Sequence, residues 1–233
     1  MSSTWEYRLF ISAHSVSELP QDCPFVTVLD NLIKNGRARD KRVDIYRFVT
    51  GEDLNELPSG IGVKHRGGSE EQVEVKCRVA IATRKGFRGL EKWEKHLQSV
   101  ASDADVTTFL QACGAVDKTK KVPNVEHGTK VTVTKMRNQA KFGSCEMLLD
   151  RLSVTSPGKD EEKWISLSVE SNKLKRVTFD LNENEINLLQ IIKNLKQSNP
   201  NILIVHGGYA SFIEYFLRNK NDYGSFQKNT MSV

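Results

Sequence analysis

The sequence predicts an α+β domain in which an antiparallel sheet curves into a β-barrel and helices pack outside it and at one end. Apolar and polar residues alternate in many separate segments, which is typical of strands with two different faces. Other segments carry apolar residues at helical spacing. The strand positions opposite the apolar face are mostly charged, and few are the Ser, Thr or Gln common on a solvated sheet face.

The first elements follow from residues 5–49. Residues 5–11 alternate, with Glu6, Arg8 and Phe10 opposite an apolar face, and we expect a strand. Residues 25–35 carry apolar side chains at helical steps and are followed by a glycine, which predicts a short amphipathic helix. Residues 42–49 alternate again and predict a second strand, which places Arg42 and Asp44 on its polar side.

Residues 61–80 predict a two-strand ribbon that turns at Gly67-Gly68. One face of the ribbon is apolar and includes His65 and Cys77, which we interpret as structural residues. The other face carries four bases and one acid. Like charges at this density repel each other unless an anion lies between them, so this face is predicted to bind an anion. These charged residues are Lys64, Arg66, Lys76, Arg78 and Glu74.

The remaining elements follow in the same way. Helical spacing predicts helices at 87–100, 105–113, 184–195 and 210–219, and alternation predicts strands at 129–137, 144–154 and 164–170. Residues 202–205 fit either a strand or an ordered coil. The strand at 129–137 has Val131 and Val133 on the same side as Lys135 and Arg137, so its apolar and charged faces are not separated.

Length and composition exclude several classes of protein. The chain has 233 residues with 38% hydrophobic content, which suits one domain over 1–221 followed by a disordered tail at 222–233. A formal charge of +5 suits a phosphorylated ligand but does not by itself indicate nucleic acid. The four cysteines form no C-x-x-C pair, and neither a signal peptide nor a long apolar segment is present. We expect a cytoplasmic monomer that neither spans nor binds a membrane.

The charged strand residues allow two interpretations. An open, half-exposed sheet explains the alternation. A closed barrel with a charged lumen explains both the alternation and the excess of charged residues. In that barrel the bases would bind the oxygens of an anion, and Glu146, Asp150 and Glu170 could supply hard oxygen ligands for Mg²⁺ or Mn²⁺.

Several short strings resemble the CYTH, or triphosphate tunnel, superfamily, and within it most closely the thiamine triphosphatases. The strings follow in the family's order over nearly the whole chain. They are RVDIY from Arg42, GVKHRGG from Gly62, VEVKC from Val73, DVTTFLQACGA from Asp105, VTVTKMRNQAKF from Val131 and EMLLDRL from Glu146.

The resemblance implies an eight-stranded tunnel that binds an inorganic or organic triphosphate, such as thiamine triphosphate or tripolyphosphate, and hydrolyses it with a divalent metal. Lys64, Arg66, Lys76, and Lys135 or Arg137 match the phosphate-binding bases, to which the charge pattern adds Arg8 and Arg78. Asp150 and Glu170 match metal-binding acids. Glu6, Glu74 and Glu146 are further candidate metal ligands. No residue is assigned as catalytic.

The first strand departs from the family's Glu-x-Glu-x-Lys signature. It has Arg8 and Phe10 at the second and third signature positions, and Ser168 replaces a glutamate expected beside Glu170. An arginine adds positive charge where a cation should bind, and each missing carboxylate weakens the attraction for a hard divalent ion. Two functions therefore stay open. One is a metal-dependent triphosphatase, and the other is a binding module for an anionic partner such as an RNA 5′ end or an acidic protein segment.

Overall fold

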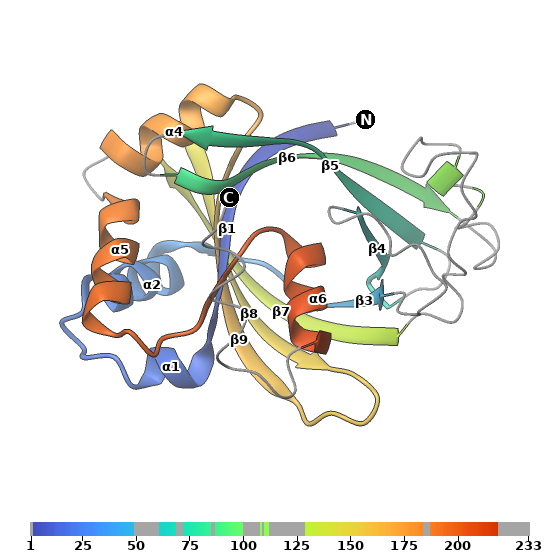
Figure 1. Ribbon diagram of the computed structural model, residues 1–233, viewed down its shortest axis with the longest axis horizontal. Helices are drawn as coiled ribbons and strands as arrows, with labels where there is room; N and C mark the ends of the chain where they lie inside the picture. Colours follow the sequence, from blue (N-terminus) through green and yellow to red (C-terminus); the bar gives the residue numbers. More distant parts are fainter. Residues whose placement is uncertain are drawn as a thin grey trace.

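Eight antiparallel strands close into a barrel in the computed structural model, which describes residues 2–48, 61–68, 72–84, 87–99, 108, 110–111, 129–183 and 187–218 (Figure 1). The sheet closes because β1 (Ser2–Ser12) pairs with both β6 (Phe87–Ser99) and β9 (Glu162–Ser171). Between these two neighbours the order is β5 (Gln72–Arg84), β4 (Ile61–Arg66), β3 (Arg42–Phe48), β7 (Thr129–Phe142) and β8 (Cys145–Thr155). The predicted closed barrel is confirmed, and the open sheet is excluded.

The barrel has a hydrophobic core on its outer side. Four helices cover this side: α1 (Ala13–Ser17), α2 (Pro24–Asn35), α4 (Leu174–Glu183) and α5 (Leu188–Ser198) (Figure 1). Leu9 of β1, Leu149 of β8 and Leu167 of β9 face these helices and are almost completely buried against residues such as Phe25 of α2. None of the described helices is long and apolar enough to cross a membrane.

The last helix packs into one end of the barrel instead of on its outer side. It is α6 (Tyr209–Arg218), and it follows β10 (Ile204–His206), a short strand that pairs with the end of β1 (Figure 1). Phe212 of α6 stacks on Phe10 of β1 with their ring centroids 4.1 Å apart, and both side chains are fully buried. Trp164 of β9 meets Phe212 edge to face. This end of the barrel is therefore filled with aromatic side chains.

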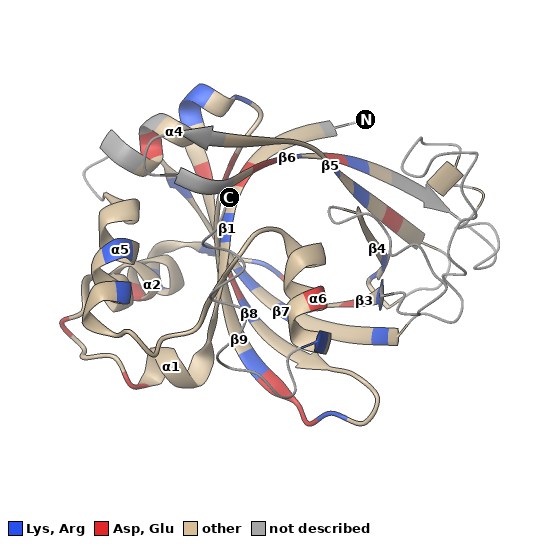
Figure 2. Cartoon of the chain, viewed as in Figure 1, with Lys and Arg blue, Asp and Glu red and all other residues tan. Residues whose placement is uncertain are grey.

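The inner face of the barrel is divided along its axis, which explains why charged and apolar residues share one side of a strand. Val131 and Val133 of β7 pack in the aromatic end with α6, whereas Lys135 and Arg137, on the same side of β7, line the open part. On β1, Glu6 and Arg8 likewise precede the aromatic Phe10. On β1 and β7 the same side of the strand thus has an apolar half and a charged half, and Figure 2 shows charged residues at intervals along the barrel strands.

One expectation about the elements needs correction. Residues 87–100 were expected to form a helix, but 87–99 form β6, which pairs with β5 and β1 on its two sides. β6 has a buried apolar residue on each face, since Leu90 lies in the outer core and Trp93 faces the lumen, so simple alternation is lost. The sequence also gave no prediction for α4, for β2 (Arg37–Ala38) or for α1. The helix expected at 105–113 lies largely outside the described residues, as does the tail at 222–233.

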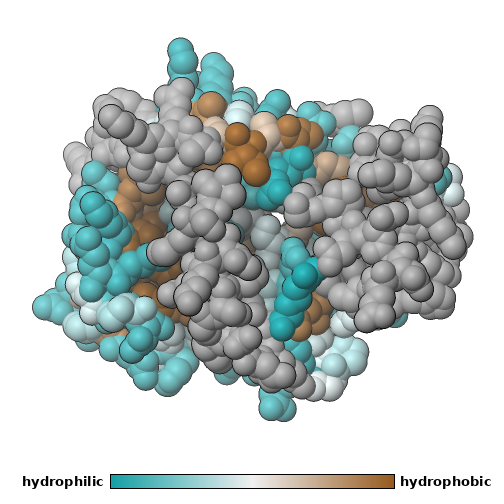
Figure 3. All heavy atoms as spheres, in the orientation of Figure 1, coloured by the Kyte–Doolittle hydropathy of each residue, from teal (hydrophilic) through white to brown (hydrophobic). Residues whose placement is uncertain are grey.

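On the face in Figure 3, the described residues are mostly hydrophilic at the periphery, and hydrophobic atoms are visible near the upper edge and towards the left. Among the described residues, large hydrophobic side chains that are more than 40% exposed include Val79 and Ile81 of β5.

Candidate functional site

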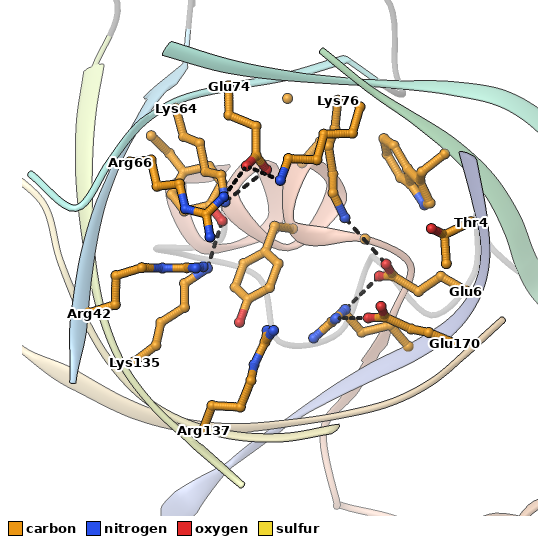
Figure 4. A pocket seen from close by; sticks show the side chains of 18 residues that line it. Thr4, Glu6, Arg42, Lys64, Arg66, Glu74, Lys76, Lys135, Arg137 and Glu170 are labelled. Atoms are coloured by element: carbon orange, nitrogen blue, oxygen red, sulfur yellow. Dashed lines mark hydrogen bonds and ion pairs between the residues drawn. The ribbon is translucent and has the colours of Figure 1, made fainter. Parts of the chain in front are cut away.

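The open half of the barrel encloses a cavity of about 210 Å³ between the strands and the start of α6 (Figure 4). Seven of the eight barrel strands contribute to its lining, and eight of the lining side chains are bases, whereas three are acids. These bases are Arg8, Arg42, Lys64, Arg66, Lys76, Lys95, Lys135 and Arg137, and the acids are Glu6, Glu74 and Glu170. Two more acids, Asp44 and Asp150, lie directly behind this lining and are completely buried.

One side of the cavity is a basic wall, which we define as Arg42, Lys64, Arg66, Lys95 and Lys135 with the acids Asp44 and Glu74. Asp44 is shared by three bases: its carboxylate lies 3.0 Å from Arg42, 3.2 Å from Lys64 and 2.9 Å from Lys135. Glu74 pairs with Lys64 and Lys95, each at 3.0 Å, and with Arg66 at 3.5 Å. Figure 4 shows Arg42, Lys64, Arg66, Glu74 and Lys135 on one side of the cavity. Five bases for two acids leave a formal charge of +3.

The opposite side is an acidic corner, which we define as Glu6, Asp150 and Glu170 around the guanidinium of Arg8. Arg8 Nε donates to Glu6 Oε1 at 2.5 Å, and the two terminal nitrogens reach Glu170 Oε1 at 2.7 Å and Asp150 Oδ2 at 3.4 Å. The hydroxyl of Ser166 accepts a further hydrogen bond at 2.7 Å. Arg8 is only 3% exposed, so its charge is held by these partners and not by water.

Two further bases complete the charge balance of the acidic corner. Arg137 binds Asp150 through two nitrogens, at 2.5 and 2.8 Å, and Lys76 lies 3.5 Å from Glu6. Arg8, Arg137 and Lys76 together balance the charges of the three acids Glu6, Asp150 and Glu170. The acidic corner is therefore formally neutral, and the excess positive charge of the cavity belongs to the basic wall.

Tyr209, the first residue of α6, forms the floor of the cavity. Its hydroxyl donates to Asp150 at 2.8 Å, its ring stacks on Tyr46, and Lys135 Nζ lies 3.5 Å from its ring centroid. Such a cation over an aromatic face is an attractive contact. Tyr209 thus joins the basic wall to the acidic corner.

Glu91 of β6 holds the turn that leads into α6. Its carboxylate accepts hydrogen bonds from the Gly208 N–H at 2.9 Å, from Trp93 Nε1 at 3.1 Å and from Arg78 at 2.7 Å. A Cβ on Gly208 would lie 2.5 Å from the Trp93 ring, so only glycine allows the turn to approach β6 this closely. The position of Tyr209 depends on this contact.

The buried charges shift each other's pKa values. Burial alone would raise the pKa of Glu6, but Arg8 and Lys76 lower it to about 2. Burial opposes ionisation of Glu74 in the same way, yet Lys64 and Lys95 lower its pKa to about 2. Burial lowers the pKa of Lys135 well below its ordinary value, and the nearby charge of Lys64 lowers it further. Glu6 and Glu74 therefore stay ionised, while an anionic ligand would favour the charged form of Lys135.

The acidic corner does not fit the divalent metal that the family resemblance implies. Mg²⁺ needs oxygen ligands at about 2.0–2.1 Å in octahedral geometry, usually with several waters retained. Glu6, Asp150 and Glu170 instead direct oxygens at the guanidinium of Arg8, which lies among them. Within the part of the chain that the structure describes, no group of three or more His, Cys, Asp or Glu side chains could hold a metal ion.

The structure brings together six of the seven bases named from the sequence. Arg8, Lys64, Arg66, Lys76, Lys135 and Arg137 line the cavity, whereas Arg78 is not part of the lining and pairs with Glu91. The five candidate metal ligands are divided. Glu6, Asp150 and Glu170 meet at Arg8, Glu74 belongs to the basic wall, and Glu146 is exposed and outside the lining.

Sequence reasoning missed several lining residues. Arg42 was placed on the polar side of its strand but was not named as a ligand-binding residue. Lys95 was missed because residues 87–100 were interpreted as a helix, and a helix there does not place Lys95 next to the strands at 61–80. Tyr209 lies just before the helix expected at 210–219, and no sequence signal shows that this helix enters the barrel.

No protein-family model matches the chain, and no curated protein sequence matches it. Solved structures similar to it include a proposed adenylate cyclase from Bacillus halodurans, with 12% identity and a TM-score of 0.39 over 82% of this chain and 92% of that chain. Another is the S. pombe Pct1 RNA triphosphatase in complex with the Spt5 CTD, with 10% identity and a TM-score of 0.32 over 84% of this chain and 82% of that chain. Because both TM-scores are below 0.5, the function proposed below is supported by the cavity residues and not by these proteins.

Proposed function

We propose that this protein binds the phosphate chain of a triphosphate in the barrel cavity. The observation that carries this proposal is the basic wall, in which five bases from four strands surround two acids and leave a formal charge of +3. Such an excess inside a partly closed cavity is unfavourable without a counter-ion. A compact ligand with several negative charges would satisfy it.

The size and chemistry of the cavity favour a phosphate chain over a whole nucleotide. Sites for drug-sized ligands typically have volumes of about 300–1,000 Å³, and this cavity is smaller, at about 210 Å³. Arg42 and Arg66 offer forked donors that suit phosphate oxygens, and Lys64, Lys95 and Lys135 offer compact charges. The organic part of a ligand such as thiamine triphosphate would then lie towards the mouth of the cavity.

Binding, and not hydrolysis, is the activity that the geometry supports best. Phosphoryl transfer relies on positioning and on stabilisation of charge on the phosphate oxygens, often with a metal ion. The basic wall supplies the positive charge. The acids that would hold a metal are instead paired with Arg8, Lys76 and Arg137.

Calorimetric titration tests the proposal, with tripolyphosphate, thiamine triphosphate, ATP and 5′-triphosphorylated RNA as ligands and orthophosphate and sulfate as smaller anions. We expect saturable binding of tripolyphosphate, with affinity falling as salt rises. Lys95→Gln should weaken binding because it removes a lining base, and its partly exposed position limits the effect on the fold. The matched control is Lys130→Gln, an exposed residue on β7 that does not line the cavity.

Two results would contradict the proposal. One is that none of the phosphate compounds binds, and the other is that Lys95→Gln and Lys130→Gln change the affinity equally. Release of orthophosphate should be measured in the same samples, and turnover would show hydrolysis in addition to binding. Binding of RNA that does not require its 5′-triphosphate would instead favour an anionic polymer as the partner.

A further inference from the structure

We propose that Arg8 is a resident cation that replaces a divalent metal, so the cavity binds metal-free phosphate chains and discriminates against their Mg²⁺ complexes. This inference rests on the phosphate binding proposed above and adds to it the ionic form of the ligand. It makes Arg8 a specificity-determining residue, since its guanidinium lines the cavity and fills the acidic corner.

The contacts of Arg8 are those of a filled site. Its guanidinium gives hydrogen bonds or ion pairs to three carboxylates and one hydroxyl, and its central carbon lies 4.9 Å from the ring centroid of Tyr209. Ser168 donates a hydrogen bond to Glu170 Oε1 at 3.0 Å, which fixes the same oxygen that accepts from Arg8. Each of the three carboxylates of the acidic corner is therefore already neutralised and held in place.

A divalent ion could enter this corner only if the guanidinium left it. Mg²⁺ would need the oxygens of Glu6, Asp150 and Glu170 at about 2.0–2.1 Å, which is closer than any of them lies to Arg8. Arg8 is 3% exposed, so moving its guanidinium out of the acidic corner would leave a buried charge without its partners. Breaking a buried ion pair in this way is strongly unfavourable.

The same arrangement affects which form of the ligand binds. Mg²⁺ bound to a triphosphate cancels two of its negative charges, and these charges are what the basic wall attracts. In a site built for a metal, carboxylates of the protein would also bind the Mg²⁺ ion, and this contact would make up for the weaker attraction to the basic wall. Here Glu6, Asp150 and Glu170 are matched by Arg8, Lys76 and Arg137, so the Mg²⁺ complex gains no new contact. The metal-free anion should therefore bind more tightly.

The first experiment compares tripolyphosphate affinity of the wild-type protein in EDTA and in excess Mg²⁺ at matched ionic strength. We expect Mg²⁺ to weaken binding by about tenfold or more, because it lowers the charge of the ligand. Equal or tighter binding in Mg²⁺ would overturn the proposal.

The second experiment titrates Mn²⁺ alone, followed by electron paramagnetic resonance and by the melting temperature. The wild-type protein should show no saturable Mn²⁺ binding. Arg8→Gln should gain it, since three carboxylates then lose their resident cation, and Arg151→Gln is the control because Arg151 is exposed on β8. Saturable Mn²⁺ binding by the wild type that Glu170→Gln abolishes would overturn the proposal, and so would a folded Arg8→Gln variant without Mn²⁺ binding.

These experiments separate the two proposals. If the wild type binds tripolyphosphate in neither condition, the proposed function fails, while the Mn²⁺ titration still decides whether Arg8 excludes metal. If Arg8→Gln does not fold, the Mg²⁺ comparison and the wild-type Mn²⁺ titration decide the role of Arg8 without it.

Discussion

Glu74→Gln should make the protein less stable and at the same time a better anion binder. Glu74 is 2% exposed and is the only acid that pairs with Lys95 and Arg66 among the ion pairs of the described cavity residues. Glutamine keeps the size of the side chain but removes its charge. The basic wall then changes from a formal +3 to +4, so its bases repel each other more strongly in the free protein and attract an anion more strongly.

The size of both effects follows from the surroundings of Glu74. Its pKa falls from an ordinary 4.5 to about 2 in the folded protein, and each pKa unit corresponds to about 1.36 kcal/mol. The ionised carboxylate therefore stabilises the fold by about 3 kcal/mol, and its loss should lower the melting temperature by roughly 6–12 °C in a chain of this size. At an effective dielectric constant of about 20, removing one negative charge about 5 Å from a phosphate favours binding by up to roughly 3 kcal/mol.

Differential scanning fluorimetry and calorimetric titration with tripolyphosphate measure the two effects. Glu146→Gln is the matched control, because Glu146 is exposed on β8 and does not line the cavity. Saturating tripolyphosphate should raise the melting temperature of Glu74→Gln more than that of the wild type. The reasoning is refuted if Glu74→Gln melts within about 2 °C of Glu146→Gln or binds tripolyphosphate no more tightly than the wild type.

Three further predictions concern pH and the entry to α6. Glu6 and Glu74 have pKa values of about 2 in the folded protein and 4.5 ordinarily. Their contribution to the stability of the fold is therefore complete above about pH 4.5 and is lost as the pH falls to about 2. Urea unfolding measured across this range should show the loss, and a free energy of unfolding that does not change with pH would contradict it. Burial lowers the pKa of Lys135, and a bound phosphate should raise it, so binding should take up protons and strengthen as pH falls. Calorimetry in buffers with different ionisation enthalpies counts these protons. Zero uptake at every pH would argue against Lys135 as a ligand contact. Gly208→Ala should cost about 1–3 kcal/mol by overpacking against Trp93, and a melting temperature equal to that of the wild type would show that the turn can move away.

Strand alternation was enough to predict the barrel and most of its lining because charged residues recur on one side of strand after strand. Lys64, Arg66 and Lys76 were found in this way, since a short turn fixes the pairing of β4 and β5. Glycines 67 and 68 in that turn both have positive φ, which few other residues adopt.

The errors arise where tertiary contacts outweigh the local pattern. β6 has one buried apolar residue on each face, Leu90 and Trp93, and their spacing resembles a helical stripe. Lys95 was therefore not recognised as a lining residue. Arg78 was expected to line the cavity, but it precedes a register irregularity in β5 and pairs with Glu91. Arg8 was named as a candidate phosphate-binding residue, and the structure places it in the cavity lining. Its role as the partner of three carboxylates depends on strands that are far apart in the sequence.

Because α6 fills one end of the barrel, a ligand must enter and leave through the same mouth. Within the part of the chain that the structure describes, Phe10, Phe212 and Trp164 fill the end of the barrel beyond Tyr209. Only a terminus of a phosphate polymer could therefore reach the basic wall. The polymer could not pass through the barrel, so the protein could not move along it. At a fixed mass of polyphosphate, the number of molecules bound would then follow the number of chain ends and would fall as the chains become longer. Binding would then depend on the concentration of chain ends and not on the length of each chain.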